Sequence, residues 1–248
     1  MQEQPVFSII TICYNAAETI ERTLRSVTSQ TWRQMQYIII DGASSDDTLN
    51  IIEGFRDRVD ILVSEPDGGL YHAMNKGLGL ATGDYVCFMN AGDRFHEDTT
   101  LEQIASQISG LDRLPGVVYG NTALCNLKGE IYGMRRLSPP EHLDWKSFKN
   151  GMLVSHQAFY ARRDIAEPYD TRYRYSADVD WCIRVMKKSD ANYNTHLTVA
   201  DYLEDGVGVT AANHKASLKE RFAIMRRHYG LVSTLLHHAW FAVRLLFK

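Results

Sequence analysis

The feature that most constrains this chain is the alternation of strand-like and helix-like patterns along its first hundred residues. Nearly continuous apolar stretches cover residues 6–13, 37–40, 61–63 and 85–89. Segments with helical patterns separate them, and the clearest has Leu70, Met74 and Leu78 at helical spacing. Strands that are rich in Ile and Val and alternate with helices predict a parallel sheet covered by helices on both faces.

The pattern changes after about residue 112. Short strand-like stretches cover residues 117–122, 131–136 and 158–162. Residues 179–186 have apolar side chains at helical spacing. We therefore expect one α/β domain over residues 1–210, in which a mixed second half, 113–210, extends the sheet of the first half, 1–112.

The charge of the 248 residues is near neutral overall but unevenly spread. The chain has 27 Lys and Arg against 30 Asp and Glu, a formal charge of −3. Residues 211–248 contain seven of those bases and one acid, Glu220, so this segment carries +6 and the rest carries −9. A chain without a strongly basic body is not expected to bind nucleic acid. We interpret residues 211–248 as a basic tail.

The cysteines and the apolar runs bear on the cellular compartment of the protein. Four cysteines without C-x-x-C spacing predict neither a disulfide framework nor a zinc cluster, which suits a reducing environment. No basic region precedes the first apolar run, so we expect no secretory signal. No apolar run reaches the roughly 20 residues that a spanning helix needs. We therefore expect a cytoplasmic protein.

Polar side chains follow each of the four expected strands. They lie in the segments 14–15, 41–44, 64–69 and 90–93. Ligands of open α/β sheets bind at the carboxyl ends of the strands. The first strand is followed by no G-x-G-x-x-G run, which disfavours NAD and FAD. The phosphate-binding G-x-x-x-x-G-K motif is absent as well. Carboxylates and amides at this edge suit a hard cation and a phosphorylated ligand, and so predict group transfer from a nucleotide.

Five segments carry a resemblance to a known family. They are FSIITICYN at 7–15, QYIIIDGASSDDT at 36–48, SEPDGGLYHAMNKGLGLATGDYVCFMNAGD at 64–93, SHQAFY at 155–160 and SADVDW at 176–181. Together they resemble the inverting family-two glycosyltransferases, and in particular the subgroup of bacterial exopolysaccharide, O-antigen and colanic-acid gene clusters. The resemblance implies the GT-A fold, a mostly parallel central sheet flanked by helices, here with an amphipathic helical tail.

The resemblance implies donor-binding roles in the first half. Three residues after the first two strands would hold the base and ribose of a UDP- or GDP-sugar: Tyr14, Asn15 and Asp41. One turn and one helix face would line the diphosphate, through Asp67, Tyr71, Asn75 and Lys76.

The stretch 90–93 matches the metal motif of the family with two acids missing. Asn90 and Gly92 stand where those acids are expected. Asp93 is then the carboxylate that would bind Mn²⁺ or Mg²⁺, with donor phosphates and water completing the shell. We therefore expect weak metal affinity without nucleotide, and a hydrogen bond to the donor from Asn90. The alternative role of Asp93 is to cap a helix that begins near Glu97.

The reaction needs a base that takes the proton of the acceptor hydroxyl. The family has an acid at the start of a helix for this step, and Asp178 in Ser176-Ala177-Asp178 matches it. Asp is also a favoured helix N-cap, so a capping role is the competing interpretation. Asp180 is the second candidate for the base.

The resemblance implies acceptor contacts from two further residues. His156 matches a position that the family uses near the acceptor or the diphosphate, and a buried core histidine is the alternative. Trp181 lies one turn beyond Asp178 and off the apolar stripe of its helix, where it would stack on an acceptor sugar or pack at an edge.

The basic tail is predicted to be helical and amphipathic. Apolar positions near its end include Trp240, Phe241 and Phe247. A basic amphipathic helix binds in the interfacial plane of an anionic membrane, which suits a lipid-linked acceptor. The alternative is that the tail packs on the body of the chain or on a second copy, as in a homodimer.

The implied function is sugar transfer in the biosynthesis of a cell-surface polysaccharide. A metal-dependent inverting enzyme would move a sugar from a nucleotide-sugar to a saccharide on a polyprenyl-diphosphate carrier, at the inner face of the cell membrane. Two alternatives stay open: transfer directly onto polyprenyl phosphate, and a non-catalytic scaffold that binds nucleotide-sugars.

Overall fold

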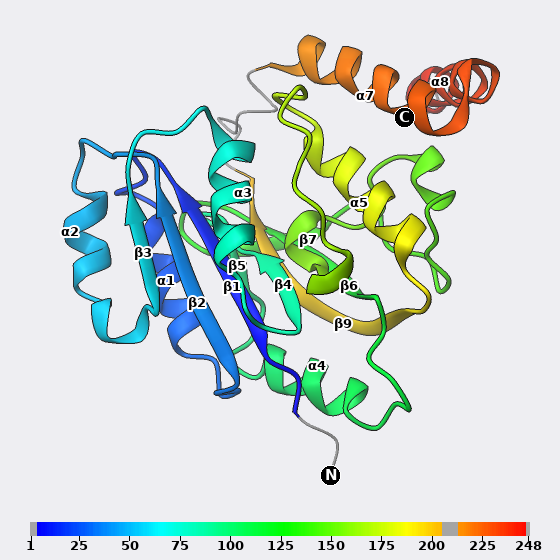
Figure 1. Cartoon of the computed structure of the whole chain (residues 1–248). Helices are drawn as coiled ribbons and strands as arrows, with labels where there is room; N and C mark the ends of the chain where they lie inside the picture. Colours follow the sequence, from blue (N-terminus) through cyan, green and yellow to red (C-terminus); the bar gives the residue numbers. More distant parts are fainter. Residues whose placement is uncertain (1–3, 205–212, 247–248) are drawn as a thin grey trace.

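The computed structural model describes residues 4–204 and 213–246 (Figure 1). Its first four strands are β1 (Phe7–Cys13), β2 (Met35–Asp41), β3 (Ile61–Ser64) and β4 (Tyr85–Phe88). Strands β3, β2, β1 and β4 lie side by side in that order and all run parallel. Every residue of β1 and β4 is buried, as expected for strands with helices on both faces. The parallel sheet predicted for the first half is confirmed.

The register of these strands brings their polar ends to one edge of the sheet. Cys13 at the end of β1 pairs with Asp41 at the end of β2, and Asp41 pairs with Ser64 at the end of β3. The residues that follow the three strands therefore emerge at the same level.

The second half extends the sheet with strands of both directions. They are β5 (Arg94–Phe95), β6 (Val117–Cys125), β7 (Ile131–Met134), β8 (Phe159–Arg162) and β9 (Asn192–Leu203). Strand β8 is antiparallel to both β4 and β6, and β9 runs parallel to β6. The described residues thus form one nine-stranded sheet. Strand β9 was not predicted, although Tyr193, Leu197 and Val199 alternate there with polar residues.

Helices cover both faces of the parallel part of the sheet. They are α1 (Ile20–Thr28), α2 (Thr48–Glu53), α3 (Leu70–Leu80), α4 (Thr100–Ile108) and α5 (Ala177–Lys188). Single 3₁₀ turns cover Arg56–Arg58, Ser147–Asn150, His156–Ala158 and Arg163–Ile165. In Figure 1 helix α3 lies in front of the sheet and α1 lies behind it. Helix α1 buries Ile20, Leu24 and Val27 at helical spacing, so its apolar stripe faces the core.

Two helices follow at the C-terminal end, α7 (His214–Tyr229) and α8 (Leu231–Leu246). Gly230 separates them at φ 80, in the left-handed region that favours glycine. Helix α7 contacts α5, and both C-terminal helices lie at the top of Figure 1. In the described part of the chain, no helix has the length and apolarity that crossing a membrane requires.

Candidate functional site

Two of the expected donor residues converge at the ends of β1 and β3. Tyr14, directly after β1, is 66% exposed. A Cβ atom added to Gly42 would lie 3.1 Å from Asp67 Oδ2 and 3.3 Å from Tyr14 Cδ2. Tyr14 and Asp67 therefore flank Gly42, and a side chain at this position would crowd both. Asp67 Oδ1 also accepts a hydrogen bond from the Gly69 amide at 2.7 Å, which fixes the turn before α3.

Asp41 is fully buried, and its carboxylate is occupied by protein groups. It accepts hydrogen bonds from the Ser44 amide at 3.0 Å and from the Ser64 hydroxyl at 2.7 Å. Asn15 Oδ1 accepts from the Ser45 amide at 2.8 Å. The expectation that Asp41 contacts the donor directly is corrected, because its register position inside the sheet leaves the carboxylate no exposed surface. Asp41 instead holds the loop that Asn15 also contacts.

Tyr71 on α3 links the donor side of the site to the expected base. Its hydroxyl donates a hydrogen bond to Asp178 Oδ1 at 3.1 Å. Burial raises the pKa of the Tyr71 hydroxyl well above its ordinary value, and the charge of Asp178 raises this pKa further. Tyr71 therefore stays protonated and donates a hydrogen bond to Asp178, which lies 107 residues later in the sequence.

Asn75 and Lys76, also on α3, are engaged by the protein. Asn75 Nδ2 donates to the Tyr169 carbonyl at 3.0 Å, and its Oδ1 accepts from the Tyr169 amide at 2.7 Å. Lys76 Nζ lies 2.9 Å from Glu65 Oε1. Asn75 thus fixes the backbone of Tyr169, whose ring stacks on Tyr71, while Lys76 stays beside the loop after β3.

Asp93 lies in the turn after β4 and is 5% exposed. Its Oδ2 accepts from Gln157 Nε2 at 2.6 Å, and its Oδ1 accepts from the Leu203 amide at 3.0 Å. Gly92 has φ +100, and a Cβ there would lie 2.7 Å from Leu203 Cδ2. The close packing of β9 explains why glycine stands at one of the positions where an acid was expected. Helix α4 begins only at Thr100, after the N-cap Thr99, so Asp93 does not cap it.

Asn90, in the turn after β4, contacts His156. Asn90 Nδ2 lies 3.2 Å from His156 Nε2, and Asn90 Oδ1 is buried without a hydrogen-bond partner among the described residues. Burial lowers the pKa of His156, so the ring is neutral near pH 7. The core-histidine alternative describes its burial, and the contact with Asn90 brings it to the turn that precedes Asp93.

The described residues contain no group of three His, Cys, Asp or Glu side chains that could hold a metal ion by themselves. Asp93 and the unpartnered Asn90 Oδ1 are nevertheless oxygen ligands of the kind that Mg²⁺ and Mn²⁺ take. Such cations are commonly held by one or two carboxylates together with substrate phosphates. The residues present therefore fit a cation that arrives with a nucleotide.

Asp178 is the second residue of α5 and is half-buried. The N-cap position of α5 is Ser176, and the Asp178 carboxylate accepts a hydrogen bond from Tyr71 on α3. The capping alternative for Asp178 is therefore not supported. Its carboxylate faces the donor side of the site.

Glu220 on α7 fixes the segment that leads into α5. Its carboxylate accepts hydrogen bonds from three consecutive amides, those of Arg174 at 2.8 Å, Tyr175 at 2.8 Å and Ser176 at 3.0 Å. Sequence reasoning missed this residue. The available signal was that Glu220 is the single acid in the basic segment 211–248.

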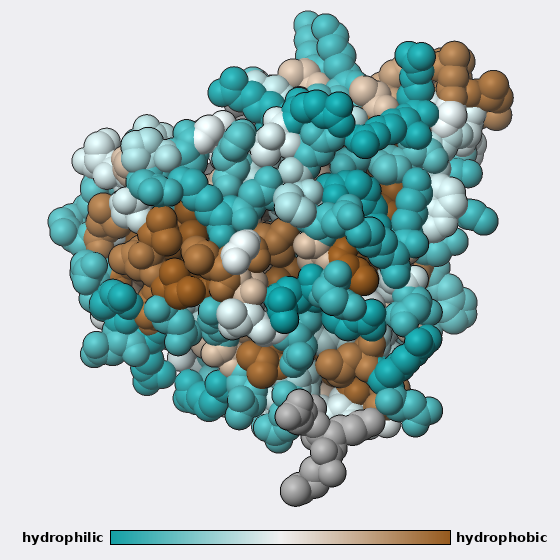
Figure 2. Space-filling view, in the orientation of Figure 1, coloured by the Kyte–Doolittle hydropathy of each residue, from teal (hydrophilic) through white to brown (hydrophobic). Residues whose placement is uncertain are grey.

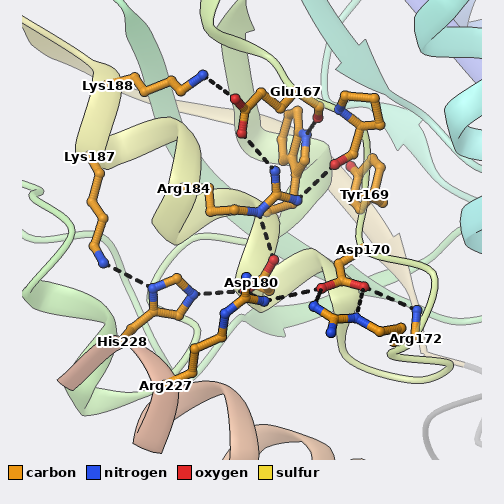
Figure 3. A network of polar contacts seen from close by, with 12 residues as sticks. Glu167, Tyr169, Asp170, Arg172, Asp180, Arg184, Lys187, Lys188, Arg227 and His228 are labelled. Atoms are coloured by element: carbon orange, nitrogen blue, oxygen red, sulfur yellow. Dashed lines mark hydrogen bonds and ion pairs between the residues drawn. The ribbon is translucent and has the colours of Figure 1, made fainter. Parts of the chain in front are cut away.

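Asp180 occupies the opposite side of α5 and is fully buried (Figure 3). It accepts from Arg184 Nε at 2.7 Å and from His228 Nε2 at 2.7 Å. Burial raises the pKa of Asp180, but the hydrogen bonds and charges of His228 and Arg184 outweigh burial and hold this pKa below its ordinary value. The second candidate for the base is thus enclosed in an ion-pair network.

Trp181 does not face an acceptor, because it is fully buried. Its Nε1 donates to the Glu167 carbonyl at 2.7 Å, and its ring stacks on Tyr169 with centroids 4.9 Å apart. The expected acceptor contact is corrected in favour of packing. Helix α5 lies between the sheet and α7, so positions away from its main apolar stripe are buried as well.

The expected tail divides into two parts. Helix α7 is bound to the body through Glu220 and through His228. Helix α8 exposes five large apolar side chains, Leu231, Val232, Leu235, Leu236 and Trp240. Figure 2 shows hydrophobic residues gathered over α8 at the upper right. Phe247 and residues 205–212 lie outside the described residues.

The chain is similar to known proteins over most of its length. A model described as Glycosyl transferase family 2 matches residues 8–169. The PGL/p-HBAD biosynthesis glycosyltransferase of Mycobacterium bovis is 33% identical over 212 residues, which cover 82% of this chain and 78% of the relative. The amylovoran biosynthesis glycosyltransferase AmsB of Erwinia amylovora is 29% identical over 73% of this chain and 64% of the relative.

Two solved structures share the fold. The S. aureus TarS 1–349 complex with UDP-GlcNAc has a TM-score of 0.69 at 18% identity, over 89% of this chain and 64% of TarS. The mannosyltransferase PcManGT from Pyrobaculum calidifontis, in complex with GDP-Man and Mn²⁺, has a TM-score of 0.66 at 16% identity. That match covers 97% of this chain and 76% of PcManGT.

Proposed function

This chain belongs to glycosyl transferase family 2, and from that premise we propose that it is an inverting transferase of cell-surface polysaccharide biosynthesis. The donor is a UDP- or GDP-sugar, and the acceptor is a saccharide on a polyprenyl-diphosphate carrier. The observation that carries the proposal is the hydrogen bond from Tyr71 to Asp178, which joins the helix of the donor side to a half-buried carboxylate.

Asp178 is the base in this proposal. The acceptor hydroxyl oxygen attacks the anomeric carbon while its proton passes to the Asp178 carboxylate. The bond between the anomeric carbon and the diphosphate oxygen breaks, and the nucleoside diphosphate leaves with the electron pair. Tyr71 donates to Asp178 and keeps the carboxylate oriented, because burial holds the tyrosine in its protonated form.

The exposed ring of Tyr14 and the carboxylate of Asp67 support donor binding at the ends of β1 and β3. Both side chains lie beside Gly42, which has no side chain of its own. In this proposal the nucleoside binds over Gly42, between Tyr14 and Asp67. Asn15 Oδ1 accepts from the Ser45 amide, and Lys76 Nζ donates to the Pro66 carbonyl, so both residues contact the loops that lead to this position. The complexes of TarS with UDP-GlcNAc and of PcManGT with GDP-Man motivate the choice of nucleotides to test.

In this proposal a divalent cation binds together with the donor. Asp93 and Asn90 would hold Mn²⁺ or Mg²⁺ together with the donor phosphates. When bound, such a cation neutralises charge that develops on the leaving diphosphate. Asp93 is already oriented by Gln157 and by the Leu203 amide, and it therefore needs little rearrangement.

The apolar side chains of α8 support a membrane contact at the inner face of the cell membrane. Leu235, Leu236 and Trp240 are each more than half exposed, and an aromatic residue among aliphatic ones suits the interfacial region. A lipid-linked acceptor would then reach the site along the membrane surface. A second copy of the chain is the other partner that could cover these side chains.

The test is the release of nucleoside diphosphate from a panel of UDP- and GDP-sugars in the presence of Mn²⁺. We expect at least one donor to give release that increases when a lipid-linked saccharide is added. Release that increases with polyprenyl phosphate alone would identify the enzyme as a polyprenyl-phosphate transferase. Binding of a donor without release under any condition would contradict catalysis and identify a scaffold.

A further inference from the structure

Arg135 and Arg221 have no ion-pair partner among the described residues. Arg135 directly follows β7, where its amide donates to the Thr122 carbonyl at 2.9 Å. Its Nη1 donates to the Leu137 carbonyl at 3.2 Å. Arg221 is on α7, next to the Glu220 that holds the segment before Asp178. In the parts of the chain that the structure describes, neither arginine forms a salt bridge.

The electrostatic couplings agree with a shared location of these groups. Burial lowers the pKa of Arg135, the charge of Arg221 lowers it further, and the charge of Asp178 raises it. The charge of Arg135 in turn lowers the pKa of His156. Arg135, Arg221, Asp178 and His156 are therefore close enough to influence one another. The hydrogen bonds place Arg135 near His156. The Arg135 amide donates to the Thr122 carbonyl, and Thr122 Oγ1 lies 2.6 Å from the hydroxyl of Ser155, the residue before His156.

The hydrogen-bonding capacity of the pair is not used up. Arg221 Nε is buried and has no acceptor among the described residues. A buried donor without an acceptor costs free energy, and so do two neighbouring positive charges in a partly desolvated place. The carboxylates of Asp178 and Glu220 both act on this region, so its charges nearly balance, but the buried Nε of Arg221 still has no acceptor among the described residues. An anion with several oxygens would satisfy the open donor and offset the repulsion.

We propose that Arg135 and Arg221 together bind a phosphate group next to Asp178. This inference rests on the proposed function and deepens it. The planar guanidinium forks match the oxygens of a phosphate, which a lysine would bind only as a point charge. The phosphate belongs either to the leaving nucleoside diphosphate or to the lipid carrier of the acceptor. The first source gives the pair a role in leaving-group departure, and the second gives it a role in acceptor recognition.

The experiment compares two site variants with two matched controls by titration calorimetry. Arg135→Gln and Arg221→Gln remove the proposed ligands, while Arg136→Gln and Arg226→Gln remove exposed arginines on the same segments. The probe is inorganic pyrophosphate. We expect its affinity to fall about tenfold or more in both site variants and to stay unchanged in the controls, because each lost bond is charge-assisted.

Two further arms distinguish the source of the phosphate. A parallel loss of affinity for UDP or GDP would identify the leaving diphosphate. Unchanged affinity for UDP and GDP, with weaker binding to phosphatidylcholine vesicles that contain polyprenyl diphosphate, would identify the lipid carrier. Vesicles without that lipid provide the baseline.

Folding is controlled by thermal unfolding and by a conservative variant. The Gln variants should be at least as stable as the wild type, because one of two repelling charges is gone, and Arg221→Lys should restore part of the affinity. Pyrophosphate that fails to bind the wild type, or that binds all variants equally, would overturn the proposal. Pyrophosphate binding that depends on both arginines in a protein that transfers no sugar would refute only the proposed function.

Discussion

Asp178 and Asp180 stand two positions apart on α5, yet their surroundings are opposite. Asp180 is fully buried and accepts hydrogen bonds from Arg184 and His228, as Figure 3 shows. Asp178 is half-buried, and its Oδ1 accepts a hydrogen bond from the hydroxyl of Tyr71. Two positions along a helix are about 200° apart around its axis, so one carboxylate faces α7 and the other faces α3. Neighbouring acids of one motif therefore have separate surroundings: Asp180 belongs to an ion-pair network, and Asp178 is the proposed base.

The same division holds for the arginines. Arg184 bridges Asp180 and Glu167 and belongs to the network that attaches α7 to α5. Arg135 and Arg221 form no such pair in the described residues and lie on the side of Asp178. Charged groups that form ion pairs within the protein therefore lie on the side of α5 that packs against α7. Charged groups without an ion-pair partner lie on the side where we expect the substrate.

The largest effect is expected from Asp178→Asn. The variant should lose about 10²–10⁴-fold in kcat, since a general base contributes that much, while nucleotide-sugar binding stays intact. Single-turnover transfer and calorimetry with the donor measure the two quantities. Asp112→Asn, which removes an exposed carboxylate, is the matched control and should leave both unchanged. Turnover retained by Asp178→Asn would remove this residue from the mechanism.

Asp180→Asn should show the opposite profile. Removing one partner of a buried pair leaves Arg184 and His228 without their acceptor charge, and we expect a loss of about 3 kcal/mol in the free energy of unfolding. Urea denaturation measures it. The folded variant should still transfer sugar. A variant that is stable but inactive would exchange the roles assigned to the two acids.

A smaller effect is expected from Glu220→Gln. Gln provides one neutral oxygen in place of a carboxylate that accepts three amides, so the start of α5 becomes less well fixed. We expect kcat to fall about tenfold, because small displacements of a reacting group are costly, with little change in the KM for the donor. Lys219→Gln, at the exposed neighbouring position, is the control. An equal loss in KM and kcat with a normal Tm would speak against a positioning role.

The smallest effect should appear in the pH dependence of stability. The pKa of Asp180 is lower in the folded protein than in the unfolded chain, whose reference value is 3.8. Its contribution is therefore fully present above that value and is lost as the pH falls through the lower folded pKa. Urea midpoints between pH 6 and about pH 3 should decrease less steeply in Asp180→Asn than in the wild type. Parallel curves would contradict this assignment.

The first half of the fold was predictable because β1, β2 and β4 are short, buried and apolar, with helical stripes between them. The alternating pattern of β9 was missed, and the partners of α7 were not predictable, since they depend on contacts between distant segments. The same limit applies within the site. Local spacing suggested Trp181 as an acceptor contact, but the packing of Tyr169 and Glu167 around it buries the ring. Arg135 gave no local signal, because the role that we propose for it depends on Arg221, 86 positions later.

The three amides held by Glu220 have a consequence for how chains of this kind can diverge. The family model ends at residue 169, whereas α5 and α7 both lie beyond it. A recombination event that exchanged α7 between relatives would replace Glu220, which fixes the segment before Asp178, together with Arg221 in a single step. We therefore expect α5 and α7 to be inherited as one unit, and chimeras joined between them to lose turnover even where each parent is active.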